Sequence, residues 1–204
     1  SGSTVDLTNQ TEGFKITVGG QTDSVTGSDG NDIIVITSAG DGNNDTLIGG
    51  SGDDVINLSA GSHTFSDDAK LATIETINAN ASATTLDLTG QLEGFTIAGG
   101  AQGDNLTGGS GNDIITGGGG DDTLKGGAGN DTLNVDSGSD IITLLGGAGA
   151  GGEDDVLVVS NGATATAANI INFVATTGTT NAGTAILSVK SDNGVINMSQ
   201  ATGV

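Results

Sequence analysis

A nine-residue period is the feature of this sequence that most constrains its fold. Between Gly99 and Thr143 the chain divides without a gap into five nonapeptides. The sixth residue of every unit is Asp: Asp104, Asp113, Asp122, Asp131 and Asp140. The eighth residue is always aliphatic: Leu106, Ile115, Leu124, Leu133 and Ile142. A flexible Gly-rich linker has no reason to keep Asp and an aliphatic residue in strict period, so the tract is predicted to be folded.

The order of residue types within a unit predicts a turn followed by a short strand. Several Gly permit a tight turn because Gly adopts positive φ at little cost. The last three residues predict a strand whose one apolar side chain points inward. A turn of this kind places backbone carbonyls beside the Asp carboxylate, an oxygen-rich shell that suits a hard cation such as Ca²⁺. With two units per coil, Asp104, Asp122 and Asp140 should stack, and Asp113 should stack with Asp131.

The five units strongly resemble the G-G-x-G-x-D-x-U-x repeats of the repeats-in-toxin (RTX) family, where U is a large apolar residue. The resemblance implies an all-β fold, a right-handed parallel β-roll or β-helix solenoid with calcium in its turns. It also implies that several calcium ions are held by the stacked Asp carboxylates together with main-chain carbonyls of the Gly-rich loops. The loop residues concerned are Gly108, Ser110, Asn112, Gly117, Gly119, Asp121, Gly126, Ala128 and Asn130.

A second, larger repeat contains the nonapeptides. Residues 3–36 align with residues 84–117 at a constant offset of 81, and 19 of the 34 positions are identical. We therefore divide the chain into a first unit (1–81), a second unit with the main roll (82–159) and a C-terminal β cap or assembly region (160–204). Tandem copies are typical of a segment of a longer repetitive protein.

The first unit carries weaker nonapeptides. Its predicted metal ligands are Asp23, Asp32, Asp45 and Asp54, with Asp23 above Asp45 and Asp32 above Asp54. About four extra residues around 38–41 are expected to distort this part of the stack. In the second unit Asp155 is displaced from the nine-residue phase, and the sequence leaves open whether it is the last ligand.

Outside the repeats the pattern changes. Ser66 is a candidate cap for a short helix ending at Leu71, and His63, the one histidine, is interpreted as a surface-loop residue without catalytic partners. Alternating apolar residues predict strands at 73–77, 83–89, 170–174, 185–189 and 195–198. The C-terminal strands should cover the open edge of the roll or dock the next subunit.

Composition excludes several functions. The 25 acidic and 4 basic residues give a formal charge of −21, which disfavours nucleic acid and anionic lipid as partners. Without Cys, thiolate catalysis and Cys-based zinc sites are excluded, and an extracellular location is favoured. No apolar run predicts membrane insertion, and no cleavable signal peptide is visible. Because the roll accounts for nearly every pair of Asp residues, we expect no enzyme.

Three functions remain. The favoured one is a calcium-binding structural protein of the bacterial cell surface, an S-layer or extracellular filament subunit that folds and self-assembles on calcium binding. The second is a segment of a large RTX adhesin, with neighbouring repeats of a longer chain and a glycan or host surface as partners. The third is the secretion or folding module of an exported RTX enzyme. The resemblance implies type I secretion from a Gram-negative bacterium.

Calcium is expected to be required for folding. Each nonapeptide buries only one aliphatic side chain, which is a small apolar contribution for nine ordered residues. Metal binding is the natural source of the remaining stability. We therefore hypothesise that the roll is unfolded or molten without calcium, and native-like circular dichroism in excess chelator would refute this.

Overall fold

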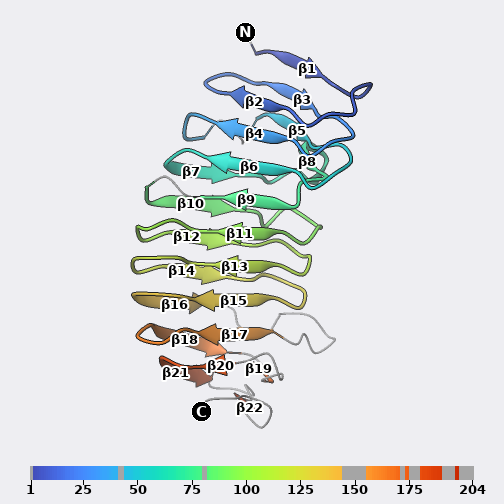
Figure 1. Ribbon diagram of the computed structural model, residues 1–204. Helices are drawn as coiled ribbons and strands as arrows, with labels where there is room; N and C mark the ends of the chain where they lie inside the picture. The colour runs from blue at the N-terminus through green and yellow to red at the C-terminus, as the bar shows by residue number, and fades with distance from the viewer. Residues whose placement is uncertain are drawn as a thin grey trace.

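The computed structural model describes residues 2–40, 44–79, 82–143, 155–170, 173–174, 180–189 and 196–197. These residues form an elongated stack of coils, in which each coil contributes short strands that lie beside those of the next coil (Figure 1). Strands β1 and β2 lie at one end of the stack, and β19 and β22 lie at the other. The 3-10 helix η2 (Asp68–Lys70) is a single short turn.

One sheet of nine strands runs along the whole stack. Its order is β2 (Lys15–Val18), β4 (Ile33–Ile36), β6 (Val55–Leu58), β9 (Thr76–Asn78), β11 (Thr96–Ala98), β13 (Ile114–Thr116), β15 (Thr132–Val135), β17 (Val156–Val159) and β20 (Thr180–Asn181). All of these strands pair in parallel. Parallel neighbours arise because the chain returns to the same side after every coil.

The other side of the stack is divided between two sheets. The first copy supplies β1 (Thr4–Asp6), β3 (Ser24–Thr26), β5 (Thr46–Ile48) and β8 (Leu71–Ala72). The second sheet contains β7 (Gly61–Thr64), β10 (Thr84–Asp87), β12 (Asn105–Thr107), β14 (Thr123–Lys125), β16 (Ser139–Thr143), β18 (Thr164–Ile170) and β21 (Thr184–Val189). These pairings are also parallel. A further parallel pair joins β19 (Phe173–Val174) and β22 (Ile196–Asn197).

The two copies form one continuous body. Strand β9, at the end of the first copy, pairs with β6 on one side and with β11 of the second copy on the other. On the opposite side, the coil between β6 and β9 supplies both the last strand of the four-stranded sheet and the first strand of the seven-stranded sheet. The nine-stranded sheet therefore crosses the boundary between copies without a break.

The core is a column of aliphatic side chains between the sheets. The eighth residue of each nonapeptide is at most 1% exposed, namely Leu106, Ile115, Leu124, Leu133 and Ile142. The residues flanking it in each strand point outward, because side chains alternate along a strand. The predicted all-β solenoid is confirmed, and the three-residue strands of the nonapeptides each point one apolar side chain inward, whereas the longer β15 also buries Val135.

Three predictions between the copies are wrong. The strand predicted at 73–77 begins only at Thr76, the first residue of β9. His63 is not a surface-loop residue: it lies on β7 opposite Leu86, is 0% exposed, and its Nε2 lies 3.0 Å from the carbonyl oxygen of Ser59. The segment Gly-Ser-His-Thr contains only one residue that favours strands, Thr64, so its pairing with β10 is what reveals the strand. Asp67, rather than Ser66, caps η2 by accepting the N–H of Ala69 at 3.2 Å.

The C-terminal strands extend the solenoid sheets. Strands β18 and β21 add to the seven-stranded sheet, and β20 adds to the nine-stranded sheet. The predicted strand at 185–189 corresponds to β21. Of the strand predicted at 170–174, residue 170 is the last of β18, and residues 173–174 form β19. Asp41 of the predicted insertion, and the ends of the predicted 195–198 strand, lie outside the described residues.

Candidate metal centre

The Asp residues at the sixth position stack along the solenoid. The backbone N–H of Asp104 donates to Asp122 Oδ1 at 2.8 Å, and that of Asp122 donates to Asp140 Oδ1 at 3.0 Å. The second stack repeats this contact, with the N–H of Asp113 at 2.9 Å from Asp131 Oδ1. Each carboxylate thus reaches back to the preceding coil, and the predicted stacking of Asp residues 18 apart is confirmed.

Longer coils keep the same contact. In the first copy the N–H of Asp23 donates to Asp45 Oδ1, and that of Asp32 donates to Asp54 Oδ1, each at 2.7 Å across 22 residues. Asp131 N–H donates to Asp155 Oδ1 at 3.0 Å across 24 residues. The extra residues therefore do not shift the register of the stacks, and Asp155 occupies the position that follows Asp131.

All ten stacked carboxylates are buried. Their exposed fractions do not exceed 6%, for Asp23, Asp32, Asp45, Asp54, Asp104, Asp113, Asp122, Asp131, Asp140 and Asp155. Burial of an anion is costly unless a positive charge or hydrogen bonds compensate it. These residues differ in how many hydrogen bonds the protein donates to their carboxylate oxygens.

In the first coil of each stack, both carboxylate oxygens accept backbone N–H groups. Asp104 accepts from Thr84 at 2.7 Å on Oδ1 and from Gly100 at 2.8 Å on Oδ2. Asp113 accepts from Phe95 at 2.7 Å and from Gly109 at 2.8 Å. The first copy has the same arrangement at Asp23 and Asp32, where Gly19 and Ser28 donate to Oδ2.

Further along two of the stacks, those that begin at Asp32 and at Asp104, a carboxylate oxygen is left open. Within the described residues no hydrogen-bond donor reaches Oδ2 of Asp54, Asp122 or Asp140. The loop before Asp122 has a different backbone, since Gly118 and Gly120 have φ of 93° and 98°. Gly50 and Gly52, before Asp54, have φ of 113° and 122°. A buried carboxylate oxygen that accepts no hydrogen bond from the protein is a suitable ligand for a cation.

The first glycine of a unit makes room for the carboxylate. A Cβ atom on Gly117 would lie 2.4 Å from Asp122 Oδ2, and one on Gly126 would lie 2.1 Å from Asp131 Oδ2. The second glycine faces the preceding coil, because a Cβ on Gly118 would lie 2.2 Å from the carbonyl oxygen of Gly100. The Gly-Gly pair is therefore required by two separate close approaches.

The fifth residue forms a second ladder in the opposite direction. Asn112 Oδ1 accepts the N–H of Asn130 at 2.8 Å, and Asp121 Oδ1 accepts the N–H of Ser139 at 2.9 Å. These side chains therefore connect each loop to the next coil. Carbonyls at positions one and three of the same loops come from Gly108, Ser110, Gly117, Gly119, Gly126 and Ala128.

Electrostatics at the stacks favour a cation. The pKa of Asp122 is raised to about 6, mainly by burial. The hydrogen bond from the Asp104 N–H lowers this pKa, and the charges of Asp140, Asp104 and Asp121 raise it. Burial likewise raises the pKa of Asp113 to about 6, although the N–H groups of Phe95 and Gly109 oppose this. Burial is also the main cause that raises the pKa of Asp54 and Asp140. At neutral pH these carboxylates are destabilising unless a positive charge compensates them.

The donor set fits calcium. Groups of three or more His, Cys, Asp or Glu side chains that could hold a metal do not occur among the described residues. A site between stacked turns must therefore combine one or two carboxylates with main-chain carbonyls, and Ca²⁺ accepts such an all-oxygen shell. The residues that would hold it are the open carboxylates and the loop carbonyls.

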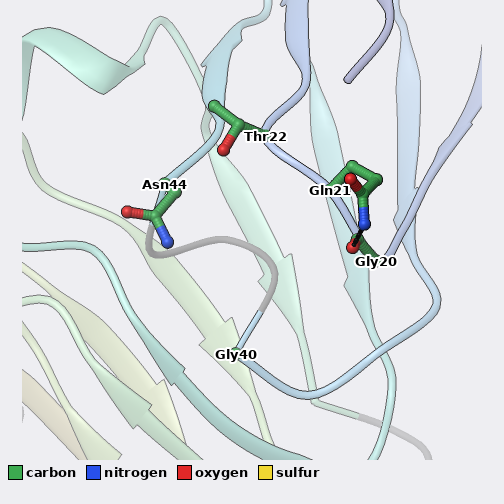
Figure 2. Close-up of a pocket in the computed structure, with 5 residues that line it drawn as sticks. All are labelled: Gly20, Gln21, Thr22, Gly40 and Asn44. Carbon is green, nitrogen blue, oxygen red and sulfur yellow. Dashed lines mark hydrogen bonds between the residues drawn. The ribbon is translucent and has the colours of Figure 1, made fainter. Parts of the chain in front are cut away.

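A separate polar cavity lies in the first copy. Gly20, Gln21, Thr22, Gly40 and Asn44 line a volume of about 280 Å³ (Figure 2). The Gln21 amide donates to the carbonyl oxygen of Gly20, as the dashed line shows. None of these five residues is charged, and none belongs to the carboxylate stacks.

No helix within the described residues has the length and apolar character to cross a membrane.

Comparison with known proteins supports the same interpretation. The family model of the RTX calcium-binding nonapeptide repeat matches residues 15–35, 37–62, 96–124, 107–142 and 116–150. No curated protein and no solved structure matches the chain. The matched ranges together cover half of the 204 residues and include the turns of both copies. The chain therefore belongs to the RTX family of calcium-binding nonapeptide repeat proteins.

Proposed function

We propose that the chain is a calcium-stabilised structural protein of the bacterial cell surface, a subunit of an S-layer or extracellular filament. The observation that carries the proposal is the set of buried carboxylates whose Oδ2 atoms no donor reaches within the described residues, at Asp54, Asp122 and Asp140. A fold that buries open anions along its axis depends on cations for stability. Control by an external ion is the property expected of a protein that is exported before it folds.

When bound, calcium supplies positive charge between the stacked turns. The chain's own residues then have two tasks. The stacked Asp residues hold the preceding coil through Oδ1, while the open Oδ2 atoms of Asp54, Asp122 and Asp140, together with loop carbonyls, would hold the ion. In the cell interior, where free calcium is low, the uncompensated carboxylates keep the chain extended and suited to type I secretion. Outside, the ion would lock the turns.

The continuity of the solenoid favours a mechanical role. The nine-stranded sheet passes from the first copy to the second through the pairing of β9 with β11 (Figure 1). Tandem copies joined in this way form a rod, whereas copies joined by a linker would move independently. A rod whose strands stack on one another along its length suits a subunit that self-assembles, and we assign it no catalytic role.

The same rod favours one other candidate, a spacer segment of a large RTX adhesin. Light scattering during a CaCl₂ titration of chelator-stripped protein separates the two. A steep rise that chelator reverses is expected for an S-layer or filament subunit. Flat scattering, with calcium-induced folding seen by circular dichroism, would overturn self-assembly and favour the spacer. Absence of any calcium response in both measurements would overturn the calcium-dependent function as a whole.

A further inference from the structure

The stack that begins at Asp32 continues to a residue that is not Asp. The N–H of Asp32 donates to Asp54 Oδ1 at 2.7 Å, and the N–H of Asp54 donates to Glu75 Oε2 at the same distance of 2.7 Å. Glu75 immediately precedes β9, as Asp54 immediately precedes β6, and these strands are paired in register. Glu75 therefore takes the place of the stacked carboxylate in its coil.

The turn before Glu75 is shorter than the others. A Cβ on Gly27 would lie 1.9 Å from the carbonyl oxygen of Gly49, and a Cβ on Gly49 would lie 2.0 Å from that of Thr73, so these three residues stack. Five residue steps lead from Gly49 to Asp54, but only two lead from Thr73 to Glu75. The additional methylene of Glu compensates for this shortening, because its carboxylate still reaches the N–H of Asp54.

Thr73 fixes this short turn. It has a φ of 52°, in the left-handed region that a β-branched residue rarely adopts. Its hydroxyl accepts the N–H of Gly50 at 2.9 Å and donates to the carbonyl oxygen of Ala72 at 2.7 Å. Strain of this kind persists where the surrounding structure holds the residue in place. The segment 73–75 is thus held against the glycine turn of Asp54.

The turn of Asp54 offers an open acceptor at this place. Asp54 is 1% exposed, and its Oδ2 is reached by no donor within the described part of the chain. Burial is the main cause that raises the pKa of its carboxyl. The hydrogen bond from the Asp32 N–H lowers this pKa, and the charges of Asp32, Glu75 and Asp53 raise it. Negative charge therefore converges on the space between Asp54 and Glu75.

Beyond Glu75 the stack is closed by apolar side chains. Ile74 is 4% exposed and lies beside Glu75 in the short turn. In the next coil Phe95 occupies the position of the stacked carboxylate, is 3% exposed, and gives its N–H to Asp113. A site that includes Asp54 must therefore be completed from Glu75, because the coil that follows offers no carboxylate at this position.

We propose that Glu75 is the terminal carboxylate ligand of a divalent cation site of calcium type, formed between the glycine turn of Asp54 and the segment 73–75. This inference rests on the calcium binding of the proposed function. It extends that function to a residue outside the repeat motif, because Glu75 lies between the matched ranges 37–62 and 96–124. The first copy thereby ends its stack with a metal site at the boundary between the copies.

The test is the replacement Glu75→Gln in the full chain, with Glu12→Gln as the control. Gln keeps the length of the side chain and an oxygen that accepts the Asp54 N–H, but removes the charge. The control removes the same charge from an exposed residue outside the stacks. Isothermal calorimetry with CaCl₂ at pH 7 should show that Glu75→Gln loses one calcium site, or binds calcium at one site at least about 10-fold more weakly. Glu12→Gln should keep all of its calcium sites with unchanged affinity.

Equal calcium stoichiometry and affinity in Glu75→Gln and Glu12→Gln would overturn the inference while leaving the proposed function intact. Absence of calcium binding by the unmodified chain would overturn the proposed function, and the inference with it. Should Glu75→Gln not fold, the ¹³C resonance of the Glu75 carboxyl carbon in the unmodified chain provides the measurement. The resonance should shift on saturation with CaCl₂, and an unchanged resonance would overturn the inference.

Discussion

Replacing Asp122 by Asn tests whether the open oxygens of the stacks are cation ligands. Asn keeps the side-chain oxygen that accepts the N–H of Asp104, but it replaces Oδ2 by an amide group and removes one negative charge. Asp104→Asn is the matched control. Both oxygens of Asp104 accept N–H bonds, from Thr84 and Gly100, so its role is accounted for without a cation.

The magnitude follows from the pKa of Asp122. Burial raises this pKa from 3.8 to about 6. A carboxyl whose pKa is raised on folding stabilises the fold below pH 3.8 and loses this contribution as the pH rises through about 6. A pKa difference of about 2 corresponds to at most about 3 kcal/mol at pH 7. Solvent near the loop screens part of the charge, which leaves about 1–3 kcal/mol.

The two variants should therefore respond differently to calcium. In chelator at pH 7, Asp122→Asn should stabilise the fold by about 1–3 kcal/mol, because the buried charge is gone. In saturating CaCl₂ it should destabilise the fold, because a charged ligand is gone. Asp104→Asn should lower stability by about 1–3 kcal/mol in both conditions, since its amide nitrogen cannot accept the Gly100 N–H.

The assay is circular dichroism, recorded between pH 4 and pH 7 in chelator and during urea unfolding in CaCl₂. The unmodified chain in chelator should gain native signal as the pH falls from 7 to about 5, because protons then neutralise Asp122 and Asp113. Asp122→Asn should show a smaller gain over this range. A loss of stability in Asp122→Asn that is equal with and without calcium would refute the reasoning.

Three further predictions concern the turn and the core. Gly126→Ala places a Cβ 2.1 Å from Asp131 Oδ2 and should raise the calcium concentration at the folding midpoint by at least about 10-fold, measured by circular dichroism; an unchanged midpoint would contradict the packing. Asn112→Ala should cost about 1 kcal/mol in urea unfolding, through the lost Asn130 N–H bond, without changing calcium stoichiometry; loss of an ion would make its side chain a ligand. His63→Ala should cost about 2–4 kcal/mol because the side chain is fully buried, and an effect below about 0.5 kcal/mol would contradict its position in the core.

Local pattern was sufficient for the repeated part of the fold. The nine-residue period predicted the turn, the short strand and the inward position of Leu124, because each depends on residues within one unit. It also predicted which Asp residues stack, such as Asp122 on Asp104, since constant spacing returns equivalent residues to the same place. The longer coils of the first copy kept this stacking because the extra residues lie outside the ladder that joins Asp32 and Asp54.

Segments without a period were predicted less well. His63 was misplaced because its strand is specified by pairing with β10, which lies some twenty residues further along the chain. Glu75 was not recognised because its short turn contains neither the Gly pair nor an Asp. Its position in the stack follows from the N–H of Asp54, a contact between coils that no local pattern contains.

The repeat pattern alone specifies a solenoid of glycine turns and buried aliphatic residues, with carboxylates in rows. Which of these carboxylates keep an open oxygen depends on contacts between coils, which the pattern does not contain. Gly109 and Gly118 both occupy the second position of near-identical units, yet Gly109 donates its N–H to Asp113, whereas Gly118 takes a φ of 93° with its α-carbon facing the carbonyl oxygen of Gly100. The difference is physical, because Gly118 packs on a glycine turn in the preceding coil, whereas Gly109 packs on the Gln91 turn at the start of the copy.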